Sequence, residues 1–220
     1  MSHLHLPDGV LPWWLWLGAL AATLVAVLAA LKRLEGRRRM LPAVAVMAAA
    51  SLAAANIPLG LPLHVNLAAL AGIVLGPALG FLAVFVANVF NTLIGHGGLT
   101  VLGVNALLVG SEALAAGGLF RLLGGSRRLL LNTCLSVLAA LLLSLALAAA
   151  VAGAAGVELE ALASHVHNGR HAPAGAGEFW ATFVAIMAPL AAVWLAVELA
   201  LTLLIVGYVR KVRGGWLERG

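Results

Sequence analysis

Residues 64–110 read HVNLAALAGIVLGPALGFLAVFVANVFNTLIGHGGLTVLGVNALLVG, and the pair Gly76-Pro77 interrupts this apolar run. Proline cannot continue a helix without a kink, so the sequence predicts one helix over 65–76 and a second over 77–95. A helix of about 12 residues covers only about 18 Å. Because the hydrocarbon core of a bilayer is about 30 Å thick, the first helix is expected to lie inside a bundle of other helices. A further helix is predicted over 99–120.

The composition indicates a membrane protein. Hydrophobic residues make up 63% of the 220 residues, charged residues make up 10%, and the mean hydropathy is +1.08. A soluble domain of this size cannot cover its surface with so few charges. Four more apolar segments, over 12–31, 40–57, 129–153 and 179–207, bring the predicted helices to about seven. We expect an all-α polytopic protein, a single transmembrane domain over residues 1–220, in a prokaryotic cell (inner) membrane.

The basic residues predict the orientation of the chain. All but one of the 13 lysines and arginines fall in the regions 32–39, 121–128 and 208–220, and Arg170 is the exception. The positive-inside rule therefore predicts that the amino terminus is outside and the carboxyl terminus is cytoplasmic. The net charge of +5 is thus explained by topology and by contact with anionic lipid, and no nucleic acid is expected as a partner.

This orientation places all seven histidines on the outer side. Histidine was not used to assign the orientation, so the clustering is independent evidence for a face that collects metal ions. One group of three lies in an outer loop predicted over 154–178, where exposed histidines without any ligand role are the alternative. The histidines are His3, His5, His64, His96, His165, His167 and His171.

The amino-terminal prefix, residues 1–11, is predicted to bind metal. It has no lysine or arginine, which a secretory signal needs, so we interpret residues 12–31 as a retained anchor. A terminal amine on Met1 followed by His3 offers amine, amide and imidazole nitrogens, a set that favours square-planar nickel(II) or copper(II). The turn Pro7-Asp8-Gly9 is suited to folding the prefix back toward the bundle. An accidental start without structure is the alternative.

The sequence lacks the common motifs of nucleotide and hydrolytic chemistry. Neither Lys32 nor Lys211 follows a GxxxxG pattern, and the chain contains no HExxH and no GxSxG. We therefore expect a protein that is not an enzyme, and any ATP hydrolysis would occur in separate subunits.

Two stretches resemble the CbiM/NikM family, the substrate-binding membrane (S) components of energy-coupling factor ABC transporters for cobalt and nickel. They are HLPDGVLP at 5–12 and the block at 64–110, in which GGLTVLGVN is the most specific part. The resemblance implies high-affinity capture and uptake of nickel(II) or cobalt(II) as the transported substrate, with no cofactor. It also implies two kinds of partner, a transmembrane coupling (T) subunit and ATP-binding cassette ATPase subunits.

The resemblance also implies a ligand set, made of the terminal amine, an imidazole of the prefix and a histidine ahead of the third helix. His5 and His64 match the two imidazoles. In the family the first histidine follows the initiator methionine directly, whereas here it stands at position five. Three arrangements remain open: removal of Met1, a wrap formed by Met1 and His3, or translation from the Leu4 codon. The choice between nickel and cobalt also remains open.

Other polar residues are candidates for supporting roles. Asp8 is placed to orient a ligand imidazole, although a turn residue needs no such role. His96 and Asn105 flank the outer loop at the GGLTVLGVN block and are expected to act as a lid or to support the ligands, with a direct ligand role as the alternative for His96. For Asn105, a hydrogen bond between helices is the alternative, as it is for Asn88 and Asn91.

Two carboxyl groups, Glu112 and Glu198, fall inside apolar segments. Such a group must be protonated, paired or directed to a polar cavity, and a role in helix contacts or partner docking is expected. Small residues recur at Ala22, Ala26 and Ala30, a spacing that lets another helix approach closely. That second helix belongs either to this bundle or to the coupling subunit.

Two other functions remain possible. A stand-alone metal channel or secondary carrier needs a polar path through the core, for which Glu112, Glu198 and a few asparagines are available. A membrane metallo-enzyme needs a carboxylate base beside paired histidines, and the sequence shows no obvious one.

Overall fold

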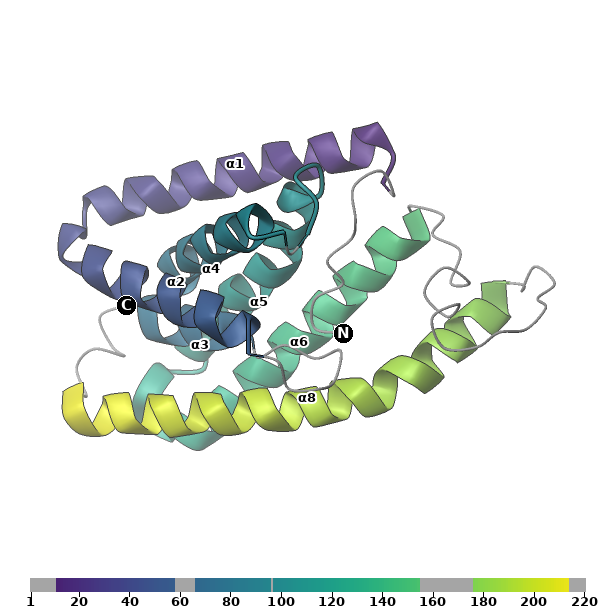
Figure 1. Ribbon diagram of the computed structural model, residues 1–220. Helices are drawn as coiled ribbons and strands as arrows, with labels where there is room; N and C mark the ends of the chain where they lie inside the picture. The colour runs from purple at the N-terminus through teal and green to yellow at the C-terminus, as the bar shows by residue number, and fades with distance from the viewer. Residues whose placement is uncertain (1–10, 58–65, 96, 155–175, 214–220) are drawn as a thin grey trace.

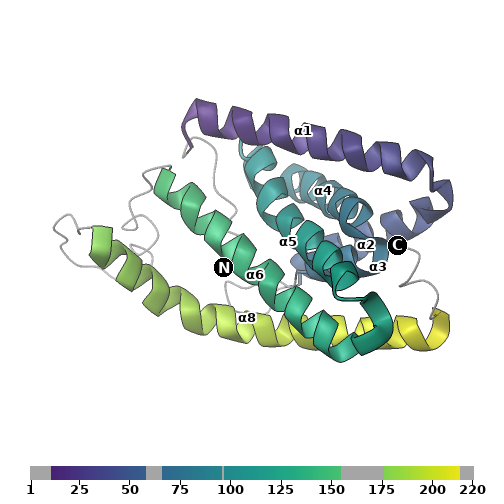
Figure 2. The ribbon, with the colours of Figure 1, turned by 180° about the vertical axis from the view of Figure 1, so that it is seen from behind.

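The computed structural model describes residues 11–57, 66–95, 97–154 and 176–213. Within these ranges the chain folds into seven α-helices and two short 3-10 helices. The helices α1 (Trp13–Glu35) and α8 (Ala176–Arg213) lie on opposite sides of the bundle (Figure 1). Between them lie α2 (Leu41–Ala55), α3 (Ala68–Leu75), α4 (Pro77–Leu93), α5 (Leu102–Leu122) and α6 (Leu129–Ala154). The view from behind shows the same arrangement (Figure 2). The predicted all-α fold is confirmed.

Four spans are long and apolar enough to cross a membrane, judged by length and composition. They are Trp13–Glu35, Arg38–Ala55, Leu102–Leu122 and Gly125–Val151, and α4 is a shorter apolar helix. On α1 the side chains of Leu24, Val25 and Leu28 are exposed, as expected of a helix that faces lipid. The predicted boundaries differ from the observed ones by a few residues. The largest difference is at α8, which continues to Arg213 instead of ending at 207.

The short helix α3 is enclosed by the others, as the sequence predicted. All eight of its residues are buried. A Cβ atom on Gly72 would overlap the backbone of Ala113 in α5, and one on Gly117 would overlap the backbone of Gly72. Because neither glycine has a side chain, α3 and α5 approach each other to backbone contact.

The pair Gly76-Pro77 forms the turn between α3 and α4. Gly76 has a φ angle of +93°, a conformation that residues with a Cβ atom rarely adopt. Pro77 occupies the first turn of α4, where its missing N–H costs no helical hydrogen bond. A Cβ on Gly80 would lie 2.7 Å from the Cα of Gly72, so the two helices return alongside each other as a hairpin.

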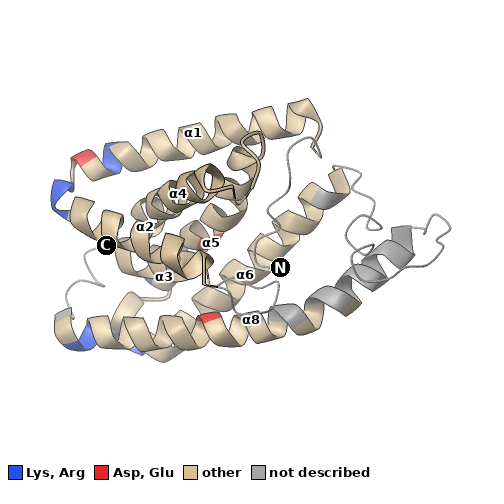
Figure 3. Ribbon diagram, viewed as in Figure 1, with Lys and Arg blue, Asp and Glu red and all other residues tan. Residues whose placement is uncertain are grey.

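The two ends of the bundle differ in charge (Figure 3). The described lysines and arginines gather where α1 and α8 end and where the 3-10 helices Arg38–Met40 and Gly125–Arg128 lie. The starts of α1 and α5 are at the opposite end, together with the end of α6. In the orientation predicted from the basic residues, the charged end is cytoplasmic and the other end is outer.

Candidate metal centre

Most of the predicted ligands lie outside the described residues. This is the case for Met1, His3, His5, Asp8, His64 and His96, and Asn105 is the one predicted site residue that the structure describes. Among the described residues, no group of three or more histidine, cysteine, aspartate and glutamate side chains could hold a metal ion. The described residues do define where the segments that carry the predicted ligands join the bundle.

The prefix joins the bundle at the start of α5. Leu11, the first described residue, is 7% exposed and packs in one apolar cluster with Val101 and Val104. Leu15 and Trp16, from the start of α1, pack against the same cluster. The chain that follows the prefix is therefore held against the GGLTVLGVN block by apolar contacts.

A close contact between α1 and α5 supports this attachment. Thr23 donates a buried hydrogen bond of 2.8 Å from its hydroxyl to the carbonyl oxygen of Gly103. A Cβ atom at Gly103 would lie only 2.6 Å from the Cα of Leu20. The absence of a side chain at Gly103 thus lets the backbone of α1 reach the first turn of α5.

The segment that carries His64 joins the bundle through Asn66, two residues later. The Asn66 side chain is buried, and its Oδ1 accepts a 2.8 Å hydrogen bond from the backbone N–H of Ala68, which starts α3. Its Nδ2 donates a hydrogen bond to Oε2 of Glu112 in α5. Both ends of the amide are satisfied, so Asn66 fixes the start of α3 to α5.

The contact with Glu112 places the start of α3 halfway along α5. Ten residues of helix separate Leu102 from Glu112, which is about 15 Å. The start of α3 is therefore recessed from the outer end of the bundle. His64 precedes Asn66 by two residues in the sequence.

Glu112 is part of a polar cluster that joins four elements. Its side chain lies near Ser144 in α6, whose hydroxyl donates a 3.4 Å hydrogen bond to the carbonyl oxygen of Leu108, and near enough to Glu198 in α8 to interact with it electrostatically. Glu112 and Glu198 are each 1% exposed. The two carboxyl groups found inside apolar segments thus meet in the interior. The contact between Glu112 and Asn66 was not predicted from the sequence. The available signal was the presence of acidic residues in membrane segments.

Asn105 lies on the same side of α5 as Glu112, since seven residues are about two helical turns. It is 5% exposed, and its Nδ2 has no hydrogen-bond partner within the part of the chain that the structure describes. A buried amide donor requires an acceptor. Asn105 is therefore a buried donor near the point where the two candidate segments join α5.

Other candidates have structural roles. Asn91 accepts a 2.9 Å hydrogen bond from Nδ2 of Asn56 and so links α4 to the end of α2, which matches the alternative given for the membrane asparagines. Ala30 is buried inside the bundle, whereas Ala22 is exposed. Of the small residues spaced along α1, Ala30 therefore packs within this bundle.

A helical bundle with these spans and with its charge at one end is that of a multi-pass membrane protein. Residues 5–216 match the CbiM family, described as the cobalt uptake substrate-specific transmembrane region. The chain belongs to this family. It is therefore a substrate-specific transmembrane component of metal uptake and not an enzyme.

Two solved structures have the same fold. One, described as a truncated transition metal transporter, has a TM-score of 0.72 and 23% identity, with 94% of this chain and 99% of that chain covered. The other, described as a transition metal transporter, has a TM-score of 0.73 and 24% identity, with 99% of this chain and 100% of that chain covered. A comparison with curated proteins gave no significant match.

Proposed function

We propose that this chain captures cobalt(II) or nickel(II) on the outer side and delivers it as the substrate-specific component of an energy-coupling factor transporter. His5 and His64 are the proposed imidazole ligands, and Met1 and His3 supply the remaining nitrogen ligands. The description of the family favours cobalt, and a set of nitrogen ligands suits nickel as well. Asp8, His96 and Asn105 are the proposed supporting residues.

One observation carries the proposal: the two segments that bear the proposed ligands are both attached to α5. The prefix ends at Leu11, which packs on Val101 and Val104. Asn66, two residues after His64, donates a hydrogen bond to Glu112. Asn105 lies between these two points on α5. Its side chain is buried, and its Nδ2 has no hydrogen-bond partner among the described residues. A ligand set shared by the two segments needs such a common support, because metal sites depend on the groups that orient their ligands.

Titration of the purified protein with cobalt(II) and nickel(II) tests the proposal. We expect His64→Ala to weaken binding of the preferred ion by about 100-fold or more. The loss of a group that merely orients a ligand already lowers metal affinity by about 10–100-fold. His167→Ala, in the other outer histidine segment, is the matched control and is expected to bind like the wild type. Equal binding by His64→Ala and the wild type would exclude His64 as a ligand.

The proposed partners are a transmembrane coupling subunit and ATP-binding cassette ATPases. The support is the family, together with a sequence that has no nucleotide-binding motif. The exposed part of α1 around Ala22 is the proposed contact for the coupling subunit, because small residues allow close approach of a second helix.

A further inference from the structure

A pocket of about 360 Å³ opens at the basic end of the bundle. Its walls come from three places that are far apart in the sequence: the end of α1 and the turn after it, the turn between α3 and α4, and the end of α5. None of the lining residues is acidic. They are Lys32, Arg33, Gly36, Arg37, Leu75, Gly76, Ala78, Leu79 and Arg121.

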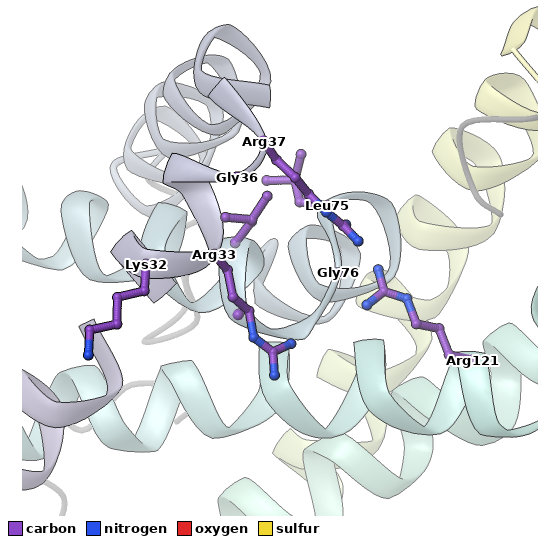
Figure 4. Close-up of a pocket in the computed structure, with 9 residues that line it drawn as sticks. Lys32, Arg33, Gly36, Arg37, Leu75, Gly76 and Arg121 are labelled. Atoms are coloured by element: carbon purple, nitrogen blue, oxygen red, sulfur yellow. The ribbon is translucent and has the colours of Figure 1, made fainter. Parts of the chain in front are cut away.

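The cationic groups of this pocket lie close together. Figure 4 shows the guanidinium groups of Arg33, Arg37 and Arg121 around Gly76, with Arg37 and Arg121 directed toward one another. Arg37 and Arg33 are near enough to repel the charge of Arg121. Like charges held together in this way are stabilised by an anion placed between them.

Arg121 has a donor that the described residues leave unused. Its Nη2 atom is buried and has no hydrogen-bond partner in the part of the chain that the structure describes. The guanidinium packs against Gly76, because a Cβ there would overlap it. The lack of a side chain at Gly76 thus leaves room for the guanidinium at the wall of the pocket.

The backbone adds further donors to the same wall. Pro77 begins α4, and Ala78 and Leu79 in its first turn line the pocket. The N–H groups of a first turn have no partner within the helix, and the positive end of the helix dipole favours an anion there. Guanidinium groups and helix amino ends are both typical ligands of phosphate.

We propose that this pocket binds a phosphate group, of the kind shared by anionic phospholipid headgroups and free phosphate. The lipid headgroup is the expected source. Leu24, Leu28 and Leu31 are exposed on one face of α1, directly before Lys32 and Arg33, so acyl chains can lie along that face while the headgroup enters the pocket. At the predicted cytoplasmic end, anionic lipids supply such headgroups.

The test compares two double variants that remove the same charge from neighbouring positions at the end of α1 and just after it. Arg33→Gln with Arg37→Gln alters the pocket, whereas Arg38→Gln with Arg39→Gln alters residues that do not line it, and all four side chains are exposed. Delipidated protein is titrated with phosphatidylglycerol, phosphatidylcholine or inorganic phosphate, and bound molecules are counted by native mass spectrometry.

We expect the wild type to prefer phosphatidylglycerol over phosphatidylcholine, and the pocket variant to lose about 10-fold in affinity for it, in line with charge-assisted contacts to phosphate. The control variant is expected to stay within about twofold of the wild type, as exposed charges outside the pocket are screened. If inorganic phosphate binds with the same dependence on Arg33 and Arg37 and the lipids are not distinguished, free phosphate is the source. Equal losses in both double variants, or no loss in either, would overturn the site.

Discussion

The side-chain amide of Asn66 donates a hydrogen bond to the carboxylate of Glu112 in the interior of the helix bundle. This contact joins residues that are 46 positions apart in the chain. Through it, Asn66, which follows the proposed ligand His64 by two residues, is joined to the middle of α5, and Glu112 in turn lies near Ser144 and Glu198. The contact therefore connects the proposed metal centre with α6 and α8.

Replacement of Glu112 by leucine is expected to affect both stability and metal binding. The variant leaves the buried Asn66 amide without its acceptor, which costs about 1–3 kcal/mol, and releases the start of α3. We expect about 10-fold weaker metal binding, as for loss of a group that orients a ligand. Glu112→Gln is the control, because its side-chain oxygen can still accept from Asn66. Metal titration and thermal unfolding in detergent give both quantities, and equal metal affinity in Glu112→Leu and wild type would contradict the role.

Two adjacent glycines in α5 offer a matched test of the packing. A Cβ on Gly117 would overlap the backbone of Gly72, whereas one on Gly118 would meet nothing within 4 Å. We expect Gly117→Ala to destabilise the protein by about 1–3 kcal/mol through overpacking. Gly118→Ala is expected to be neutral or to stabilise by up to about 1 kcal/mol through helix propensity. Thermal unfolding distinguishes the two, and equal midpoints would argue against backbone contact between α3 and α5.

The contact between α1 and α5 is expected to position the prefix. Gly103→Ala places a Cβ 2.6 Å from the Cα of Leu20 and should push the start of α1 away from α5. We expect metal binding to weaken by about 10-fold, because ligand sites tolerate little displacement. The control is Gly18→Ala, whose Cβ would meet nothing within 4 Å. Equal metal affinity in Gly103→Ala and Gly18→Ala would show that the contact between α1 and α5 does not position the prefix.

Uptake into vesicles distinguishes the transporter component from the two alternative functions. We expect liposomes that contain this chain alone to accumulate no cobalt(II) or nickel(II) above empty liposomes, since a polar path needs groups free to bind the ion and Glu112 is engaged by Asn66. Uptake should require a coupling subunit, ATPases and ATP. Accumulation by the chain alone would favour a channel or secondary carrier instead.

Much of the fold follows from local features of the sequence. The length of the apolar segments predicted the helices, and Gly76-Pro77 predicted the turn that ends α3. The short length predicted for that helix, about 12 residues, also predicted its burial, because about 18 Å of helix cannot span a hydrocarbon core of about 30 Å. These features depend on neighbouring residues and on the bilayer, and both can be evaluated without a structure.

The contacts between distant segments were not predictable in the same way. Glu112 and Glu198 stood out as acidic residues in apolar segments, but Asn66, the hydrogen-bond partner of Glu112, lies in a different part of the chain. The pocket of Arg33, Arg37 and Arg121 likewise arises only when the end of α1 and the end of α5 meet at Gly76. A contact of this kind depends on how helices pack, which hydrophobic periodicity does not determine.

His5 and His64, from two distant segments, are proposed to bind the same metal ion. A double-mutant cycle with His5→Ala, His64→Ala and the double variant, read out by cobalt(II) and nickel(II) titration, tests it most directly. If the two residues share one ion, each single variant loses most of the affinity, and the double variant is little worse than either. Losses that simply multiply, or wild-type affinity in either single variant, would contradict a shared site.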